Sequence, residues 1–419
     1  MKPSRDRLRR LCPILLFVAV LAVTISTLVA TAEGTTAKSA LAPTSLQQAS
    51  VTVKAADLGD FSGEAPVIES PAAILINATT GKVLYEHNAY KVRRMASTTK
   101  IMTAILTLEK LKLDDTVVAS ENAVNTIEPV PFLKVGDTFT VEQMLYAMML
   151  RSANSAAVVL AEACSGSVAD FADEMNAKAA DLGMTASNFI NPNGLDTTGH
   201  ESSAADMATL ARYAMQNEKF REIVSTKEYT LPLPGRKALT CENTNQLLGK
   251  YDWVTGIKTG LTPKAEQCLV ASATRDGVNV ISVVLGQPVP KVCFAESAAL
   301  LDYGLGQCKP LTLLEEGQVM AEAELPYVLD GRLRLIAAET VKTELYKDES
   351  VTMSVQLEKQ LELPVTAGEV FGTVSLVQDG ETVQTVDLVA ASSQGRTTLG
   401  SKAAYLWRRM GRALGRLFS

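Results

Sequence analysis

Three short motifs, far apart in the sequence, limit what this chain can fold into more than any other feature. They are Ser97-Thr98-Thr99-Lys100, then Ser152-Ala153-Asn154, and then Lys258-Thr259-Gly260. A serine three residues before a lysine lies on the same face of a helix as the lysine. A lysine amine that is desolvated and close to other cations can accept the serine proton. The pattern therefore predicts a fold that brings three distant segments together around one serine nucleophile.

The second and third motifs supply the other groups that such a serine needs. Ser152 and Asn154 can relay the proton and hold an acyl group. Lys258 and Thr259 provide a cation and a hydroxyl group suited to a substrate carboxylate, and Gly260 lets their strand come close to the substrate. Each motif alone occurs by chance in many chains, but the three in this order form a specific signal.

Composition argues against several other functions. The chain has 419 residues, enough for about two to three domains, and its 47% hydrophobic content can supply a core. A net charge of −6 gives no overall basic surface for nucleic acid. Its two histidines, His87 and His200, are far apart in the sequence, so no metal or cofactor is expected. Because a Ser-His-Asp site needs a histidine base, scarce histidine favours a lysine-based serine enzyme.

The N-terminus predicts export. Five basic residues precede an apolar stretch over 11–29, and Ala30-Thr31-Ala32 is a small-residue cleavage site. We expect residues 1–32 to be a cleaved signal peptide, with an uncleaved anchor as the alternative; both place the body of the protein outside the cytoplasm. Residues 33–65 are rich in Ala, Ser, Thr, Gln and Gly without sustained periodicity, which predicts a flexible linker.

Hydrophobic patterns predict an α+β catalytic domain over residues 66–308. Residues 72–76 and 82–85 predict a hairpin with a glycine turn. The segment that follows Ser97 is a helix that is apolar on nearly all faces, and such a helix is buried. Ser97 is therefore expected at the N-terminal end of a buried helix, where the positive end of the helix favours developing negative charge.

Further elements should carry the other two motifs. Thr140 and Gln143 form a capping box that starts a helix, and helical spacing returns at 156–164. The second motif should therefore lie on a short connection between two helices. The third motif lies on an extended segment, 253–262. Two further predicted strands flank an Asp276-Gly277 turn and complete an antiparallel sheet; they cover residues 267–274 and 278–285.

The C-terminal part has a different texture. Residues 309–395 contain short strand-like runs with Asp-Gly turns, which predict a small all-β domain. Residues 396–419 predict an amphipathic helix, because Trp407, Phe418 and other apolar residues share one face and five basic residues share the opposite one. We expect this helix to lie in the plane of an anionic membrane surface. Packing on the protein's own domain is the alternative.

Residues 68–395, about four fifths of the chain, resemble the D-alanyl-D-alanine carboxypeptidases, which are low-molecular-mass penicillin-binding proteins of serine peptidase family S11. Beyond the three motifs, the likeness covers residues 73–77 with 81–85, 94–97, 188–195 with Gly199-His200, 243–248 and 255–257. It implies a transpeptidase domain of the penicillin-binding protein and serine β-lactamase type, in which an antiparallel sheet adjoins a helical subdomain. The order of signal, linker, catalytic domain, β domain and amphipathic tail matches the family too.

The resemblance also implies an activity and its catalytic residues. The expected reaction removes the terminal D-alanine from peptidoglycan stem pentapeptides through an acyl-enzyme at Ser97, and β-lactam antibiotics should inhibit it. Lys100 would be the general base, and Ser152 would pass the proton to the leaving amine. The backbone amides of Ser97 and Leu261 would form the oxyanion hole. The expected place of action is the outer face of the bacterial cytoplasmic membrane.

Substrate binding follows from the same resemblance. Asn154 would hold the acyl side chain, while Lys258 and Thr259 would bind the terminal carboxylate beside Gly260. Two positions depart from the family pattern. Ser155 stands where the family commonly has Asp, and Glu266 stands where it commonly has Gly. We expect altered tuning from these two changes, and not loss of activity.

Two other functions compete with this prediction. A serine β-lactamase shares the three motifs but needs efficient water activation for deacylation, usually by a positioned glutamate. A catalytically silent protein that binds peptidoglycan or β-lactams is the second alternative, and intact Ser97 and Lys100 argue against it. Outside the signal the chain has five cysteines, an odd number, so that not all can pair within one chain; a Cys293–Cys308 bridge is left open.

Overall fold

The computed structural model describes residues 50–415, except 326, 329–330, 359–360 and 379. The predicted signal peptide, residues 1–32, lies outside the described residues. The chain divides into two compact units, each of which is described by itself. One unit covers Leu58–Pro310, and the other combines the chain up to Asp57 with the chain from Leu311 onward.

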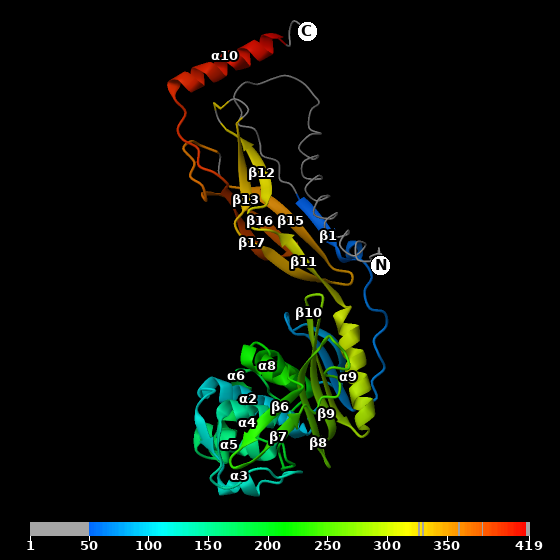
Figure 1. The fold of residues 1–419 in the computed structure, drawn as a ribbon. Helices are drawn as coiled ribbons and strands as arrows, with labels where there is room; N and C mark the ends of the chain where they lie inside the picture. The colour runs from blue at the N-terminus through cyan, green and yellow to red at the C-terminus, as the bar shows by residue number, and fades with distance from the viewer. Residues whose placement is uncertain (1–49, 326, 329–330, 359–360, 379, 416–419) are drawn as a thin grey trace, which may run out of the picture. The chain divides into compact units, whose positions relative to one another are not determined.

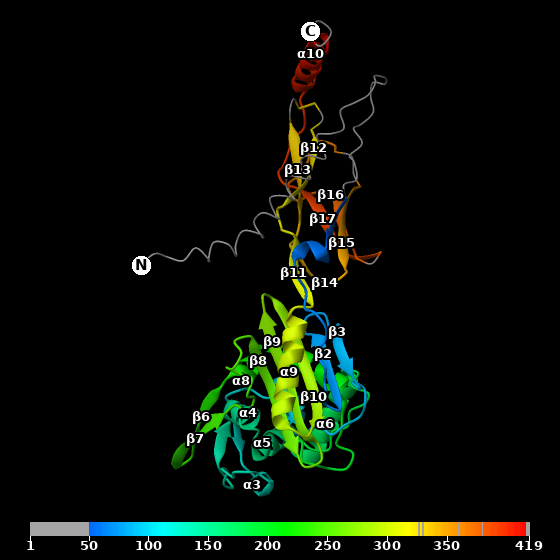
Figure 2. The ribbon, with the colours of Figure 1, turned by 90° about the vertical axis from the view of Figure 1, so that its right-hand side faces the viewer.

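A five-stranded antiparallel sheet forms the centre of the Leu58–Pro310 unit, with strand order β3-β2-β10-β9-β8. The strands are β2 (Ala72–Asn77), β3 (Val83–His87), β8 (Val254–Thr262), β9 (Glu266–Arg275) and β10 (Val278–Gln287). The predicted hairpins at 72–85 and 267–285 are confirmed. Every residue of β2 and nearly every residue of β10 is buried, since both faces of the sheet are covered. Helix α9 (Pro290–Leu305) packs on the sheet (Figure 2). Helix α7 (Ala204–Ala214) contacts strands β2, β9 and β10.

A helical layer adjoins this sheet (Figure 1). Its helices, besides α7, are α2 (Lys100–Lys110), α3 (Glu121–Asn125), α4 (Val141–Met149), α5 (Asn154–Ser165), α6 (Val168–Asp181) and α8 (Glu218–Ser225). Short strand pairs β4 (Thr116–Val118) with β5 (Thr138–Thr140), and β6 (Glu228–Leu233) with β7 (Arg236–Glu242), lie at its edge. The first eight residues of α2 are buried, because helices α4, α5, α6, α7 and α8 all contact this helix. The predicted buried helix is thus confirmed.

The start of that helix differs from the prediction. The helix α2 begins at Lys100, and Ser97 lies one turn earlier in a 3-10 helix, η2 (Ala96–Thr99). The capping box that precedes the second motif is present as predicted. Thr140 N donates to Gln143 Oε1 at 2.9 Å, and Gln143 N donates to Thr140 Oγ1 at 3.1 Å.

No single helix in the described part of the chain is both long and apolar enough to cross a membrane. Only α5 and α6 reach that length and composition together, and they are bent by 82° relative to each other.

The second unit is built on a six-stranded antiparallel sheet, in the order β1-β15-β16-β17-β13-β12. Its strands are β1 (Ser50–Lys54), β12 (Val319–Glu324), β13 (Arg332–Ala337), β15 (Ser350–Leu357), β16 (Val370–Gln378) and β17 (Glu381–Ala390). Strands β11 (Cys308–Leu314) and β14 (Val341–Tyr346) form a separate two-stranded sheet. The prediction of an all-β region is confirmed, and its core includes Leu333, Val365 and Phe371.

Strand β1 corrects the prediction of a flexible linker over residues 33–65. It pairs in antiparallel register with β15, and Val53 is buried. Valine alternates with polar residues in Ser50–Lys54, as in a strand with one buried face. Five residues of alternation were too few to stand out from the polar composition around them. The remaining part of that range up to residue 49 lies outside the described residues.

The C-terminal helix α10 covers Leu399–Gly415, within the range predicted from amphipathic spacing. It contacts the β unit through Tyr405, whose ring packs edge-on against Tyr327, and through Lys402, whose ammonium lies over the same ring. Leu406, Trp407 and Met410 are exposed by 53%, 74% and 55%. The helix therefore touches its own domain and still presents a large apolar surface. Phe418 of the predicted apolar face lies outside the described residues.

The five cysteines outside the signal are free thiols in the structure, so Cys293 and Cys308 are not bridged. All but Cys164 are buried. Burial raises the pKa of the Cys268 thiol to about 12, which makes this group unreactive at neutral pH.

Candidate active site

The Lys100 ammonium is the centre of the site. Its Nζ donates to Ser97 Oγ at 2.8 Å, to Asn154 Oδ1 at 2.7 Å and to the Asn193 carbonyl oxygen at 2.6 Å. Lys100 is completely buried, while Ser97 is half-buried. All three ammonium donors are therefore used, and one of them is aimed at the hydroxyl of the predicted nucleophile.

Burial lowers the pKa of Lys100 well below its ordinary value, because the charged form loses its hydration. The nearby Lys258 ammonium lowers this pKa further, and the Glu128 carboxylate opposes both effects. Lys258 is itself buried, and burial lowers its pKa to about 7. A neutral amine at Lys100 can take the proton of Ser97, so the electrostatics suit a general base near neutral pH.

The second motif lies at the start of helix α5. Asn154 is the first residue of the helix, and its Nδ2 donates to the Ile127 carbonyl oxygen at 2.8 Å. That bond turns the amide oxygen of Asn154 toward Lys100. Ser152 lies on the connection before α5 with a φ of +65°, and its hydroxyl makes no hydrogen bond with the described part of the chain. The structure thus joins Asn154 to Ser97 through Lys100 and does not join Ser152 to them.

The third motif lies on β8, the edge strand of the central sheet. Lys258 Nζ donates to the carbonyl oxygen of its neighbour Thr259 at 3.0 Å. The Thr259 hydroxyl lies 2.6 Å from the hydroxyl of Thr244, which also donates to the Leu150 carbonyl oxygen at 3.2 Å. Leu261 is 64% exposed at the end of this strand. Apart from the electrostatic effect of Lys258 on Lys100, the side chains of Lys258 and Thr259 make their hydrogen bonds with their own strand and with Thr244.

Two glycines enclose the peptide bond before the nucleophile. A Cβ atom on Gly260 would lie 3.0 Å from Ser97 N and from Met95 O. On Gly194 it would lie 2.0 Å from Ala96 O and 2.8 Å from Ser97 N. The sequence predicts that Gly260 brings its strand close to the substrate, whereas in the structure its close neighbour is the nucleophile's own turn. Ala96 has a φ of +47°, a left-handed conformation that this enclosure holds in place.

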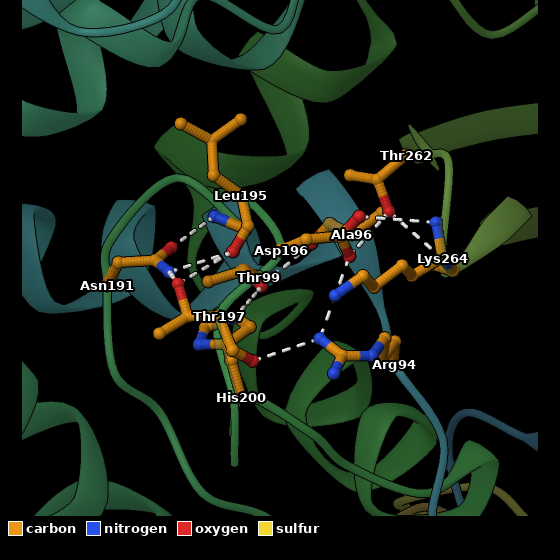
Figure 3. Close-up of polar contacts among 12 residues, drawn as sticks. Arg94, Ala96, Thr99, Asn191, Leu195, Asp196, Thr197, His200, Thr262 and Lys264 are labelled. Carbon is orange, nitrogen blue, oxygen red and sulfur yellow. Dashed lines mark hydrogen bonds and ion pairs between the residues drawn. The ribbon is translucent and has the colours of Figure 1, made fainter.

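The loop over residues 188–200, which includes Gly194, also reaches the same peptide bond by hydrogen bonds through His200 and Thr99 (Figure 3). His200 Nδ1 accepts from Ile190 N at 3.0 Å, so Nε2 carries the proton and donates to Thr99 Oγ1 at 2.8 Å. Thr99 Oγ1 in turn donates to Ala96 O at 2.8 Å. Burial, helped by the charge of Arg94, lowers the pKa of His200 to about 4. His200 is therefore neutral at neutral pH and links the 188–200 loop to the turn of the nucleophile.

Asp196 ties this loop to the β8–β9 hairpin (Figure 3). Its carboxylate accepts from Thr262 Oγ1 at 2.9 Å and from Lys264 N at 3.2 Å. Arg94 Nη1 lies 3.7 Å from the Asp196 carboxylate and donates to the Thr197 carbonyl oxygen at 2.9 Å. Asp196 thus connects the segment before the nucleophile with the strand that carries the third motif.

Residue types alone did not point to Asn193 or to Glu128. Asn193 acts through its carbonyl oxygen, which every residue has, and the only signal was its place in a loop that resembles the family. Glu128, which raises the pKa of Lys100, is remote from Lys100 in the sequence. Among the described residues, no group of three or more His, Cys, Asp or Glu side chains is arranged to hold a metal ion.

A serine hydroxyl facing a buried lysine amine, between a helical layer and an antiparallel sheet, defines the class of serine enzymes that use a lysine base. Residues 60–289 match the family model of the D-alanyl-D-alanine carboxypeptidases, and residues 309–395 match that of the penicillin-binding protein 5 C-terminal domain. The chain belongs to the D-alanyl-D-alanine carboxypeptidase family, in which a serine acyl-enzyme is the general mechanism.

Relatives and solved structures agree with this assignment. The chain is 35% identical to D-alanyl-D-alanine carboxypeptidase DacF of Bacillus subtilis (strain 168), over 75% of this chain and 82% of that protein. It is 32% identical to DacC of Escherichia coli (strain K12), over 78% and 84%. Among solved structures, penicillin binding protein 5 from Haemophilus influenzae gives a TM-score of 0.59 at 29% identity, covering 80% of this chain and all of that one.

The enclosure of the nucleophile's peptide bond gives a test. Gly194→Ala should slow the covalent labelling of the protein by fluorescent penicillin by about 10²-fold, since the new methyl group displaces Ala96 and Ser97. Gly166→Ala is the matched control, because Gly166 has the same positive φ and no atom within 4 Å of its Cβ position. The control should retain fast labelling. Equal slowing in both variants would show that backbone strain, and not the displaced nucleophile, limits the reaction.

Proposed function

We propose that Ser97 and Lys100 carry out the family's reaction in this chain, the hydrolysis of the terminal D-alanine from peptidoglycan stem peptides. The main support is the 2.8 Å hydrogen bond between Lys100 Nζ and Ser97 Oγ, together with the complete burial of Lys100. We assign the remaining groups to Ser152 and to the buried Lys258; Asn154 of the second motif contacts Lys100, and Lys258 lowers the pKa of Lys100.

The proposed reaction has two halves. Ser97 Oγ attacks the carbonyl carbon between the two D-alanines while its proton moves to Lys100 Nζ. The amine of the leaving D-alanine takes this proton from Lys100 Nζ by way of Ser152, the C–N bond breaks, and an ester to Ser97 and a neutral Lys100 amine remain. Water then attacks this ester with Lys100 as the base, which releases the shortened peptide and restores the Ser97 hydroxyl.

The oxyanion that forms in both halves needs fixed donors. We assign the backbone amides of Ser97 and Leu261 to this role. Their support is the enclosure of the Ala96–Ser97 peptide bond by Gly194 and Gly260, which holds the Ser97 amide in one orientation. Loss of one such donor typically costs about 2.7–4 kcal/mol of transition-state stabilisation.

Substrate recognition is assigned to the second and third motifs. Asn154, whose amide is oriented by Ile127, holds the acyl side of the substrate. Lys258 and Thr259 bind the terminal carboxylate next to Gly260. Burial lowers the pKa of Lys258 because its charged form loses hydration. A substrate carboxylate next to Lys258 would stabilise the charged form in place of the lost water. β-Lactams, which resemble the same terminus, would acylate the same serine.

The place of action follows from the two ends of the chain. We propose that residues 1–32 direct export and are removed, and that α10 docks the protein on the outer face of the cytoplasmic membrane. The support for docking is the exposure of Leu406, Trp407 and Met410 on a helix that carries several basic residues.

The nucleophile assignment is tested by intact-mass analysis after incubation with penicillin. The unmodified protein should gain one penicillin mass, located by peptide mapping to the peptide that contains Ser97. Ser97→Ala should gain none, and Lys100→Met should fold but acylate at least 10²-fold more slowly because it lacks the base. Persistent labelling of Ser97→Ala would contradict the assignment.

The carboxylate role of Lys258 predicts a difference between two substrates. Lys258→Ala should lower kcat/KM for a peptide that ends in free D-Ala-D-Ala about 10- to 100-fold more than for its C-terminal amide, since only the acid offers a charged partner. Any indirect effect through the pKa of Lys100 would reduce both values alike. Lys264→Ala, at the exposed hairpin turn, is the control and should change neither. Equal losses on acid and amide would rule out carboxylate recognition by Lys258.

Membrane docking by α10 predicts binding to anionic vesicles that weakens at high salt. Replacing Leu406, Trp407 and Met410 together by Gln should release most of the protein into the supernatant after sedimentation, with activity on a soluble peptide unchanged. Val383→Gln removes an exposed apolar side chain from β17 and should leave binding intact. Vesicle binding that survives the triple replacement would point to another part of the chain as the anchor. All proteins compared should begin after Ala32.

A further inference from the structure

Two consecutive residues of the segment before strand β5 accept hydrogen bonds from the start of helix α5. The Ile127 carbonyl oxygen accepts from Asn154 Nδ2 at 2.8 Å. Glu128 Oε2 accepts from Ser155 N at 2.9 Å and from Ser155 Oγ at 2.8 Å. Two neighbouring residues of this segment therefore fix two neighbouring residues of the helix, and one of these, Asn154, contacts Lys100.

Glu128 supplies a cap that the helix lacks in its own sequence. The N-cap residue Ala153 has no side-chain acceptor for the free amides of the first turn. Glu128 accepts one of these amides and places a negative charge at the positive end of the helix, which is a stabilising arrangement. Position 155 has a hydroxyl and no carboxylate of its own, so the carboxylate at this helix start comes from a segment 27 residues away in sequence.

Two charged groups shift the pKa of Lys100, and a third titratable group, His200, lies near it. Lys258, on β8, lowers its pKa, and Glu128 raises it. His200, on the loop next to α2, is neutral above a pKa of about 4 and adds no charge at neutral pH. Glu128 is therefore the one negative charge among these three groups.

We propose that Glu128 is a positioning residue for the acylation base: it holds the start of α5 so that Asn154 faces Lys100, and its negative charge offsets that of Lys258. The inference rests on the proposed function of Lys100. Removal of the charge should disfavour the protonated form of Lys100, so that the neutral amine exists at lower pH. In the rate of acylation plotted against pH, the acidic limb should then move to lower pH.

The experiment measures the rate of penicillin acylation against pH in the full-length protein. Glu128→Gln should shift the acidic limb down by about 0.5 to 1.5 pH units, the effect of one charge several ångströms away in a partly buried site. Glu162→Gln is the matched control. Glu162 lies on the same helix α5 and accepts from Asn122 Nδ2 at 2.8 Å, away from Lys100. The acidic limb of the Glu162→Gln variant should coincide with that of the unmodified protein.

Ser155→Asp provides two further arms. In the Glu128→Gln background it returns a carboxylate to the same place and should restore the original limb. With Glu128 intact it adds a second negative charge and should move the limb to higher pH, an outcome that does not depend on the folding of the Glu128 variant. A role of Glu128 in folding alone would lower the thermal midpoint without moving any limb.

The possible failures can be told apart. If the unmodified protein is not acylated at Ser97, or shows no acidic limb, the proposed function fails. If it is acylated with an acidic limb that neither Glu128→Gln nor Ser155→Asp moves, the present inference fails and the proposed function stands. A limb that moves equally in Glu162→Gln would show a general charge effect and would also overturn the inference.

Discussion

The burial of one ammonium group is the interaction on which the rest of the site depends. Lys100 has no exposed surface, and its three donors go to Ser97, Asn154 and the Asn193 carbonyl oxygen. A buried charge is costly unless every donor is satisfied, so each of these partners has to be held in place. One partner is the nucleophile, and the others come from different segments of the chain. The hydrogen bonds that Lys100 needs therefore also bring Ser97, Asn154 and Asn193 together in one site.

Several distant segments of the chain hold the turn that contains Ala96 and Ser97. Gly194 and Gly260 leave no space for a side chain beside the Ala96–Ser97 peptide bond, and Thr99 and His200 hold its carbonyl side. Asp196 then joins the 188–200 loop to the β8–β9 hairpin. The central sheet and the helical layer are thus connected by hydrogen bonds close to the nucleophile, where small displacements have the largest effect on the rate.

Residue chemistry explains which parts of this arrangement could be predicted. Ser97, Lys100 and Asn154 were found because their side-chain types, in that order, have a chemical meaning, and the structure brings them together. The helix start was misplaced by one turn because the sequence does not show that Ala96 adopts a positive φ. Asn193 contributes a backbone carbonyl, for which no residue type is diagnostic. Strand β1 was missed because its five alternating residues are too few to stand out, and because its partner, β15, lies about 300 residues away in the sequence.

In the proposed reaction, the two buried lysines also link substrate recognition to the base. Lys258 has a pKa of about 7 and is only partly charged at neutral pH. A substrate carboxylate beside it favours its protonated form, since opposite charges stabilise each other. A fully charged Lys258 in turn disfavours a proton on Lys100. The substrate carboxylate is itself an anion and opposes this effect, so the charges of Lys258 and of the carboxylate largely cancel at Lys100. Glu128 raises the pKa of Lys100 and so limits how far Lys258 can lower the basicity of the amine.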